Sequence, residues 1–107
     1  MSASSRGAAR ERQVRALFTE AGWYVVRAAA SLGEADIVAM KRGHVPVFVQ
    51  VKSDKAGPFA HFGPFARMGL VAEAHRAGAR AVLCWWPARK EAVWFVGPEF
   101  HDHEPPL

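Results

Sequence analysis

Residues 33–53 read GEADIVAMKRGHVPVFVQVKS, and the two apolar runs within this stretch decide the fold. The runs at 35–40 and 46–52 are rich in valine and other apolar residues, and the charged turn 41–44, which contains a glycine, joins them. Such runs are typical of strands that are buried on both faces. The stretch therefore predicts a hairpin at the centre of the protein.

Three polar side chains interrupt this apolar pattern. Asp36 lies at the start of the first run, and Gln50 and Lys52 lie at the end of the second. Because side chains alternate along a strand, Gln50 and Lys52 share one face, and Asp36 stands beside that face if the runs pair. An acid, an amide and an ammonium group in a buried hairpin cost free energy unless they are paired or bind a ligand. The sequence predicts the functional site here.

Length and composition restrict the class of protein. The 107 residues suit a single domain, with residues 1–5 and 101–107 as flexible tails, and the hydrophobic half of the chain is enough for one core. The net charge of +4 is compatible with a polyanionic partner but does not require one. The single cysteine, Cys84, excludes an internal disulfide and a cysteine-built zinc site. Without a signal peptide or a membrane-length apolar run, we expect an intracellular, cytoplasmic protein (host cytoplasm if viral).

A first helix is predicted for residues 7–21. Its apolar positions recur at helical spacing: Val14, Leu17, Phe18 and Ala21. Glu11 lies on or beside this face, where it could complement the helix dipole or serve a site, and the pattern leaves both open. The helix also carries four arginines, which are either solvated or contact phosphates: Arg6, Arg10, Arg12 and Arg15.

The next segments are a strand at 23–28, a loop of small residues at 28–33, and, after the hairpin, a loop at 53–63. Ser31 is a candidate polar contact in the first loop, although an ordinary loop serine is the simpler interpretation. Lys55 lies among aromatic residues in the second loop, as is found both at nucleic-acid contacts and at lids or interfaces.

A second helix is predicted for 64–77, with Phe65, Met68, Ala72 and His75 roughly on one face. Strands at 79–86 and 91–96 follow, and both are apolar on their two alternating faces. One small chain does not readily cover so much apolar surface, so we expect a homodimer. The order of elements predicts an α/β (α+β) domain with a central mixed sheet of about five strands flanked by helices.

The acid on one strand and the polar-x-Lys fourteen residues later resemble the motif of the PD-(D/E)xK nuclease superfamily. Here the motif reads Glu34-Ala35-Asp36 and Gln50-Val51-Lys52. Residues 6–56 resemble, more narrowly, the archaeal-type Holliday junction resolvases. That likeness rests on a glycine and a Glu-Arg pair that open the first helix, a V-V-R strand, a serine-containing loop of small residues, and the strands ADIVAM and VFVQVKS.

The resemblance implies a restriction-endonuclease-like core and a homodimeric endonuclease that uses Mg²⁺, with Mn²⁺ as a substitute and no small-molecule cofactor. Its substrate would be branched DNA, a four-way junction cut by paired symmetric cleavage. Glu11 and Asp36 would be metal-site carboxylates, Gln50 and the Val51 carbonyl would complete the metal site, and Lys52 would activate water and stabilise the phosphate. Ser31 matches a loop serine near the site. The DNA-contacting residues would be Arg6, Arg10, Arg12, Arg27 and Lys55.

Gln50 departs from the family pattern, which has glutamate at this position. An amide oxygen can bind Mg²⁺, but it carries no charge and cannot act as a base. Two explanations stay open: a native glutamine whose missing charge Glu11 partly supplies, or an inactivating substitution that keeps the side-chain shape.

Three other functions remain alternatives to junction resolution. The first is a restriction-like, repair or RNA nuclease of the same fold. The second is a nucleic-acid-binding or dimerisation module with a dead site, and the third is a basic domain in which Asp36 and Lys52 form only a buried ion pair.

Overall fold

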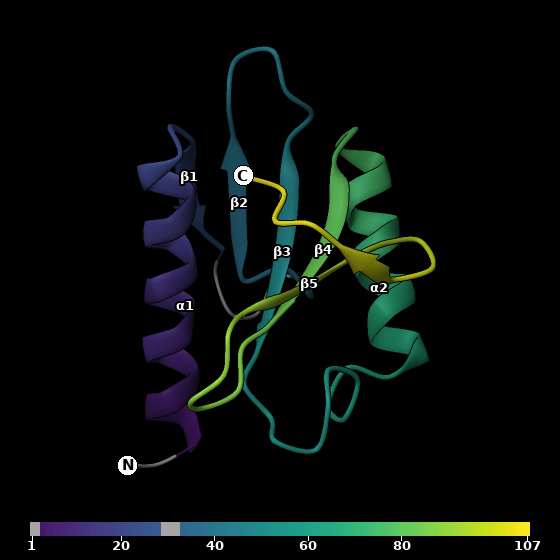
Figure 1. Cartoon of the computed structure of the whole chain (residues 1–107). Helices are drawn as coiled ribbons and strands as arrows, with labels where there is room; N and C mark the ends of the chain where they lie inside the picture. Colours follow the sequence, from purple (N-terminus) through teal and green to yellow (C-terminus); the bar gives the residue numbers. More distant parts are fainter. Residues whose placement is uncertain (1–2, 29–32) are drawn as a thin grey trace.

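The computed structural model describes residues 3–28 and 33–107, and the side chains from Gly7 onward within those ranges. Within them lie two helices and six strands (Figure 1). In chain order these are α1 (Ala3–Glu20), β1 (Tyr24–Arg27), β2 (Ile37–Met40), β3 (Val47–Lys52), α2 (Pro64–Arg76), β4 (Arg80–Trp85), β5 (Val93–Val96) and β6 (His101–His103).

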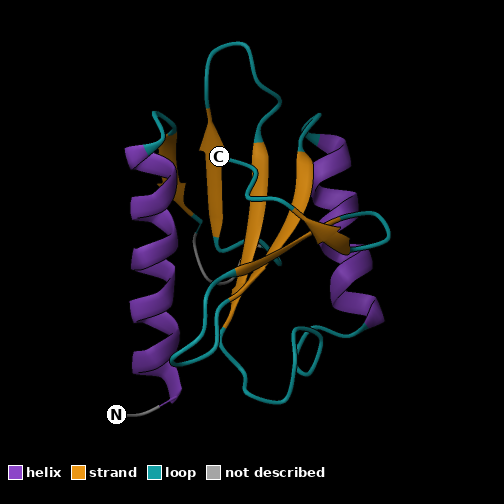
Figure 2. Ribbon diagram, viewed as in Figure 1, coloured by secondary structure: helices purple, strands orange, loops and turns teal. Residues whose placement is uncertain are grey.

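The six strands form one mixed sheet whose spatial order follows the sequence, β1 to β6. Strands β3 and β4 are parallel, and every other neighbouring pair is antiparallel. Parallel neighbours need a long crossover connection, and α2 provides it. Figure 2 shows the sheet between the two helices, so each helix covers one face. This arrangement confirms the predicted sheet flanked by helices.

Each helix buries its own core against the sheet. On the α1 side, Phe18 packs edge-on against Trp23 and Trp94, with ring centroids 5.6 and 5.8 Å apart. On the α2 side, Leu70 and Ala74 pack with residues of β4 and β5. The predicted apolar face of the first helix is confirmed, since Val14 and Phe18 are fully buried and Leu17 and Ala21 pack against them.

Both chain ends depart from the expected flexible tails. The first helix begins at Ala3, so residues 3–5 are helical. At the other end, His101–His103 form β6, which pairs with β5 through Val96 and His101, and Pro106 is buried. The strand satisfies backbone groups that would otherwise line an open edge of β5, and it raises the strand count from the expected five to six.

The apolar faces of the strands at 79–86 and 91–96 were expected to need cover from a second copy of the chain, but they are largely buried within the protein itself. Strands β4 and β5 contribute residues to the cores on both faces of the sheet, and Ala81–Cys84 are fully buried or nearly so. In contrast, the predicted apolar face of the second helix points outward: Phe65 is 90% exposed and Met68 is 66% exposed. The helix packs through Leu70 and Ala74 instead, and the small Ala74 allows it to lie close to the sheet.

No helix in the described part of the chain is long and apolar enough to cross a membrane.

Candidate active site

The end of the hairpin brings Asp36 onto β3. Its backbone N–H donates to the Val49 carbonyl over 2.8 Å, which extends the β2–β3 pairing by one residue beyond Ile37. Its carboxylate atom Oδ2 accepts the Val51 N–H over 2.8 Å. The Asp36 side chain thus takes the place of a strand partner where β2 has not yet begun.

Gln50 is the one buried polar or charged residue among those described, with 7% of its surface exposed. The Gln50 side chain is oriented so that its amide nitrogen faces two acceptors. The nitrogen donates to Asp36 Oδ2 over 2.8 Å and to the Glu34 carbonyl oxygen. An ionised glutamate could make neither donation. In this arrangement Gln50 holds Asp36 rather than presenting its own oxygen beside it.

Burial raises the pKa of Asp36 from 3.8 to about 6. The Val51 hydrogen bond and the Lys52 ammonium lower this pKa, whereas the Glu11 and Glu34 carboxylates raise it. Asp36 is therefore a partly buried acid whose charged form a nearby cation would stabilise.

Lys52 shares the Gln50 face of β3, as predicted from strand alternation. Within the described residues it forms no ion pair, so the Asp36–Lys52 ion pair of the simplest alternative is not formed. Its ammonium group acts on Asp36 only through its charge.

Glu11 approaches the same end of the sheet from α1. Its Oε1 accepts from Arg27 Nε of β1 over 2.9 Å, and its side chain is 18% exposed. Glu11 is near enough to raise the pKa of Asp36, but its carboxylate is already paired. Among the residues with described positions, no three His, Cys, Asp or Glu side chains are arranged to hold a metal ion.

The donors present are nevertheless oxygens of the kind that Mg²⁺ prefers. They are the Asp36 carboxylate, the carbonyl of Val51 and, if its amide turns, the Gln50 oxygen, with Glu11 available if it leaves Arg27. Mg²⁺ commonly keeps several waters and takes only one or two carboxylates from the protein. The residues fit that chemistry. The site has one negative charge fewer than it would have if a second free carboxylate stood beside Asp36.

The predicted DNA-contacting residues differ in what they contact. Arg10 is engaged within the protein: its guanidinium donates to the Trp86 and Pro87 carbonyls at 2.9 and 3.0 Å and stacks on the Trp86 ring. Arg12, Arg27 and Lys55 are exposed. Ser31 and the Arg6 side chain lie outside the described residues.

Two acidic residues belong to the site's surroundings although sequence reasoning gave them no role. Glu34 provides the carbonyl that accepts from Gln50, and its N–H donates to Glu73 Oε1 of α2 over 2.7 Å. Glu34 stood in the quoted motif. Nothing in the sequence marks Glu73, because an acid on a helix is ordinary.

The family model for archaeal Holliday junction resolvases (Hjc) matches residues 2–105. The chain belongs to this family. A solved structure agrees: Hjc of Archaeoglobus fulgidus, described as a Holliday junction resolvase from an archaeal hyperthermophile, is 28% identical with a TM-score of 0.69. The match covers 80% of this chain and 72% of that one. A search of curated proteins found no match.

Membership of the resolvase family confirms the predicted function, a structure-selective endonuclease that acts on DNA junctions. It also confirms the predicted fold class. Nuclease families of this kind generally use a divalent metal ion.

Proposed function

We propose that this chain is a Mg²⁺-dependent resolving enzyme in which Asp36 and Lys52 are the central catalytic groups. The observation that carries the proposal is the cluster at the end of β3, where Asp36, with a pKa raised to about 6, lies beside buried Gln50 and under the charge of Lys52. Perturbed acids of this kind concentrate at functional sites.

Each residue has a task in phosphodiester hydrolysis. Asp36 and the Val51 carbonyl would hold the ion, which when bound polarises a phosphoryl oxygen and makes its water more acidic. Lys52, unpaired within the described residues, stabilises negative charge that builds on the phosphate. Gln50 fixes the Asp36 carboxylate by donating to Oδ2. An intracellular location, which gives access to branched DNA, is part of this proposal.

Cleavage of labelled four-way junctions tests the function directly. We expect Mg²⁺-dependent, paired, symmetric nicks on the junction and little cleavage of a linear duplex of the same sequence or of RNA. Equal cleavage of the linear duplex would favour a restriction-like or repair nuclease. Replacement of Mg²⁺ by Mn²⁺ should preserve the products, and EDTA should abolish them.

A second candidate is a module that binds junctions without cleaving them. The donation from Gln50 to Asp36 favours it, because an amide stands where a second carboxylate would bring charge to the ion. Tight junction binding with no cleavage under any divalent ion would support this candidate.

Recognition should rest on phosphates and DNA shape rather than on base edges. We expect log K to fall by ~0.9 per neutralised phosphate as log salt rises, and Arg12→Ala to reduce that slope by about one. Arg42→Ala is the matched control, because Arg42 is exposed in the β2–β3 turn, at the opposite end of the hairpin. Titrations at several salt concentrations measure both slopes; an unchanged slope for Arg12→Ala would remove it from the interface.

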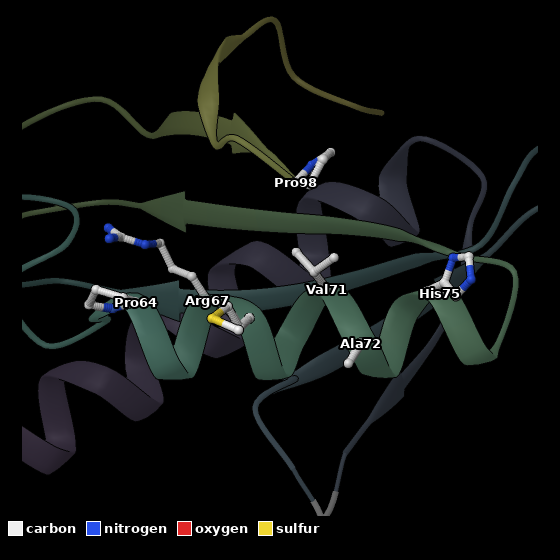
Figure 3. A pocket seen from close by; sticks show the side chains of 7 residues that line it. Pro64, Arg67, Val71, Ala72, His75 and Pro98 are labelled. Atoms are coloured by element: carbon white, nitrogen blue, oxygen red, sulfur yellow. The ribbon is translucent and has the colours of Figure 1, made fainter.

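We also propose that the enzyme is a homodimer, and the exposed face of α2 supports this. Phe65 and Met68 are exposed there, and a neighbouring groove runs between α2 and Pro98, toward which Val71 points (Figure 3). Large exposed apolar side chains of this kind commonly mark an interface.

Phe65→Glu combined with Met68→Glu should convert the dimer to a monomer without unfolding it, since both side chains are exposed. Val45→Glu, at a position 52% exposed in the β2–β3 turn, is the control and should stay dimeric. Sedimentation velocity distinguishes the species, and a double variant that remains dimeric would place the interface elsewhere.

A further inference from the structure

A side chain of helix α2 makes a hydrogen bond to the backbone of residues 33–36, the acidic segment that precedes β2. Glu73 Oε1 accepts the backbone N–H of Glu34 over 2.7 Å, across 39 positions of sequence. The acceptor carries charge, so this hydrogen bond is stronger than one between neutral groups.

Two glycines allow this close approach. Gly33 has φ +150°, a backbone region that L side chains rarely adopt, and a Cβ there would run into the Glu73 carboxylate. On the helix, a Cβ at Gly69 would lie 3.2 Å from Glu34 Cγ. The absence of side chains on both sides brings the segment and the helix into direct contact.

Glu34 is held on its other side by the site itself. Its carbonyl accepts from the Gln50 amide, and the same amide donates to Asp36 Oδ2. The backbone of Glu34 therefore bridges Glu73 on α2 and Gln50 on β3, two residues before Asp36. Without the Glu73 acceptor the Glu34 N–H loses this partner, while the neighbouring Ala35 stays buried in the core that contains Leu70 and Ala74.

We propose that Glu73 is a positioning residue for the active site: through the Glu34 N–H it fixes the backbone that places Asp36 against Val51 and Gln50. This inference rests on the proposed function for its catalytic consequence. This role requires an acceptor oxygen at the right distance from the Glu34 N–H, and it does not require that oxygen to be charged. Variants of Glu73 can therefore test it.

Three variants separate reach from charge. Glu73→Ala removes the acceptor, Glu73→Asp withdraws it by one methylene, and Glu73→Gln keeps an oxygen at the same reach without the charge. For Ala and Asp we expect kcat for junction cleavage to fall roughly tenfold, because small misplacements of a reacting group are costly. KM and junction affinity should stay unchanged. Glu73→Gln should restore kcat to near the wild-type value.

Amide hydrogen exchange, followed by NMR, gives a readout that does not depend on cleavage. In Glu73→Ala the Glu34 amide should exchange roughly tenfold faster, since its net hydrogen bond is lost. The Val51 amide, which donates to Asp36, should shift its resonance. Glu73→Gln should leave the Val51 amide as in the wild-type protein, and it should protect the Glu34 amide more than Ala does but less than the charged wild-type acceptor.

Unchanged Glu34 and Val51 amides in Glu73→Ala would overturn the inference, as would a Glu73→Gln variant no better than Ala. A wild-type chain that cleaves nothing would refute the proposed function instead, and the two amides would still decide whether Glu73 holds the segment.

Discussion

Asp36→Asn is expected to abolish metal-dependent cleavage and, at the same time, to make the metal-free protein more stable at neutral pH. Cleavage should fall by about a hundredfold or more, because asparagine brings no charge to a cation. Stability should rise because the wild-type carboxylate is charged while partly buried, and desolvation is the largest influence on its pKa.

The sign of the pH dependence follows from the pKa shift. The pKa of Asp36 is about 6 in the folded protein against 3.8 ordinarily, so the folded state binds the proton more tightly than the unfolded state. Wild-type stability is therefore reduced above pH 6, recovers as the pH falls toward 4, and is unaffected by this group below that. The asparagine variant should gain about 1–2 kcal/mol at pH 8, less than the full shift implies, because some water still reaches the carboxyl.

Urea unfolding at pH 8, 6 and 4 in EDTA measures this difference. The midpoint of Asp36→Asn should exceed that of the wild type at pH 8, and the gap should close by pH 4. Asp54→Asn is a suitable control, since Asp54 lies in the loop after β3, pairs with His61 and is not among the groups that shift the pKa of Asp36. A wild-type protein that is more stable than Asp36→Asn at pH 8 would show that Asp36 is stabilised as an anion.

Gln50→Glu is expected to raise the rate of metal-dependent junction cleavage, by roughly tenfold or more if ligand charge limits metal affinity. The variant supplies a second carboxylate beside Asp36 and removes the two amide donations that now hold Asp36 and the Glu34 carbonyl. Without an ion, two carboxylates face each other in a buried site and repel. The metal-free variant should therefore be less stable than the wild type.

Two measurements made in parallel decide the role of Gln50. Single-turnover cleavage of a four-way junction gives the rate, and thermal unfolding with and without Mn²⁺ gives the gain in stability on metal binding, which should be larger for Gln50→Glu. Gln50→Ala is the matched control, because it removes the amide without adding charge. A rate that is unchanged or lower in Gln50→Glu would contradict a ligand role at this position.

Local patterns in the sequence predicted both helices, five of the six strands and the centre of the site. Helical spacing identified the buried face of α1, with Val14 and Phe18, because 3.6-residue periodicity is a local property. Strand alternation placed Gln50 and Lys52 on one face for the same reason. The family motif and the polar residues in a buried hairpin both led to Asp36, which the structure places beside Gln50.

Contacts between residues far apart in the chain follow from the tertiary fold and not from local patterns. Arg10 contacts Trp86, Glu11 pairs with Arg27, and Glu73 holds Glu34, at separations of 76, 16 and 39 positions. The same holds for the outward face of α2, whose apolar residues satisfied a helical pattern without being buried. Local periodicity shows that a helix has faces, but which face is buried depends on how closely small residues such as Ala74 let it approach the sheet.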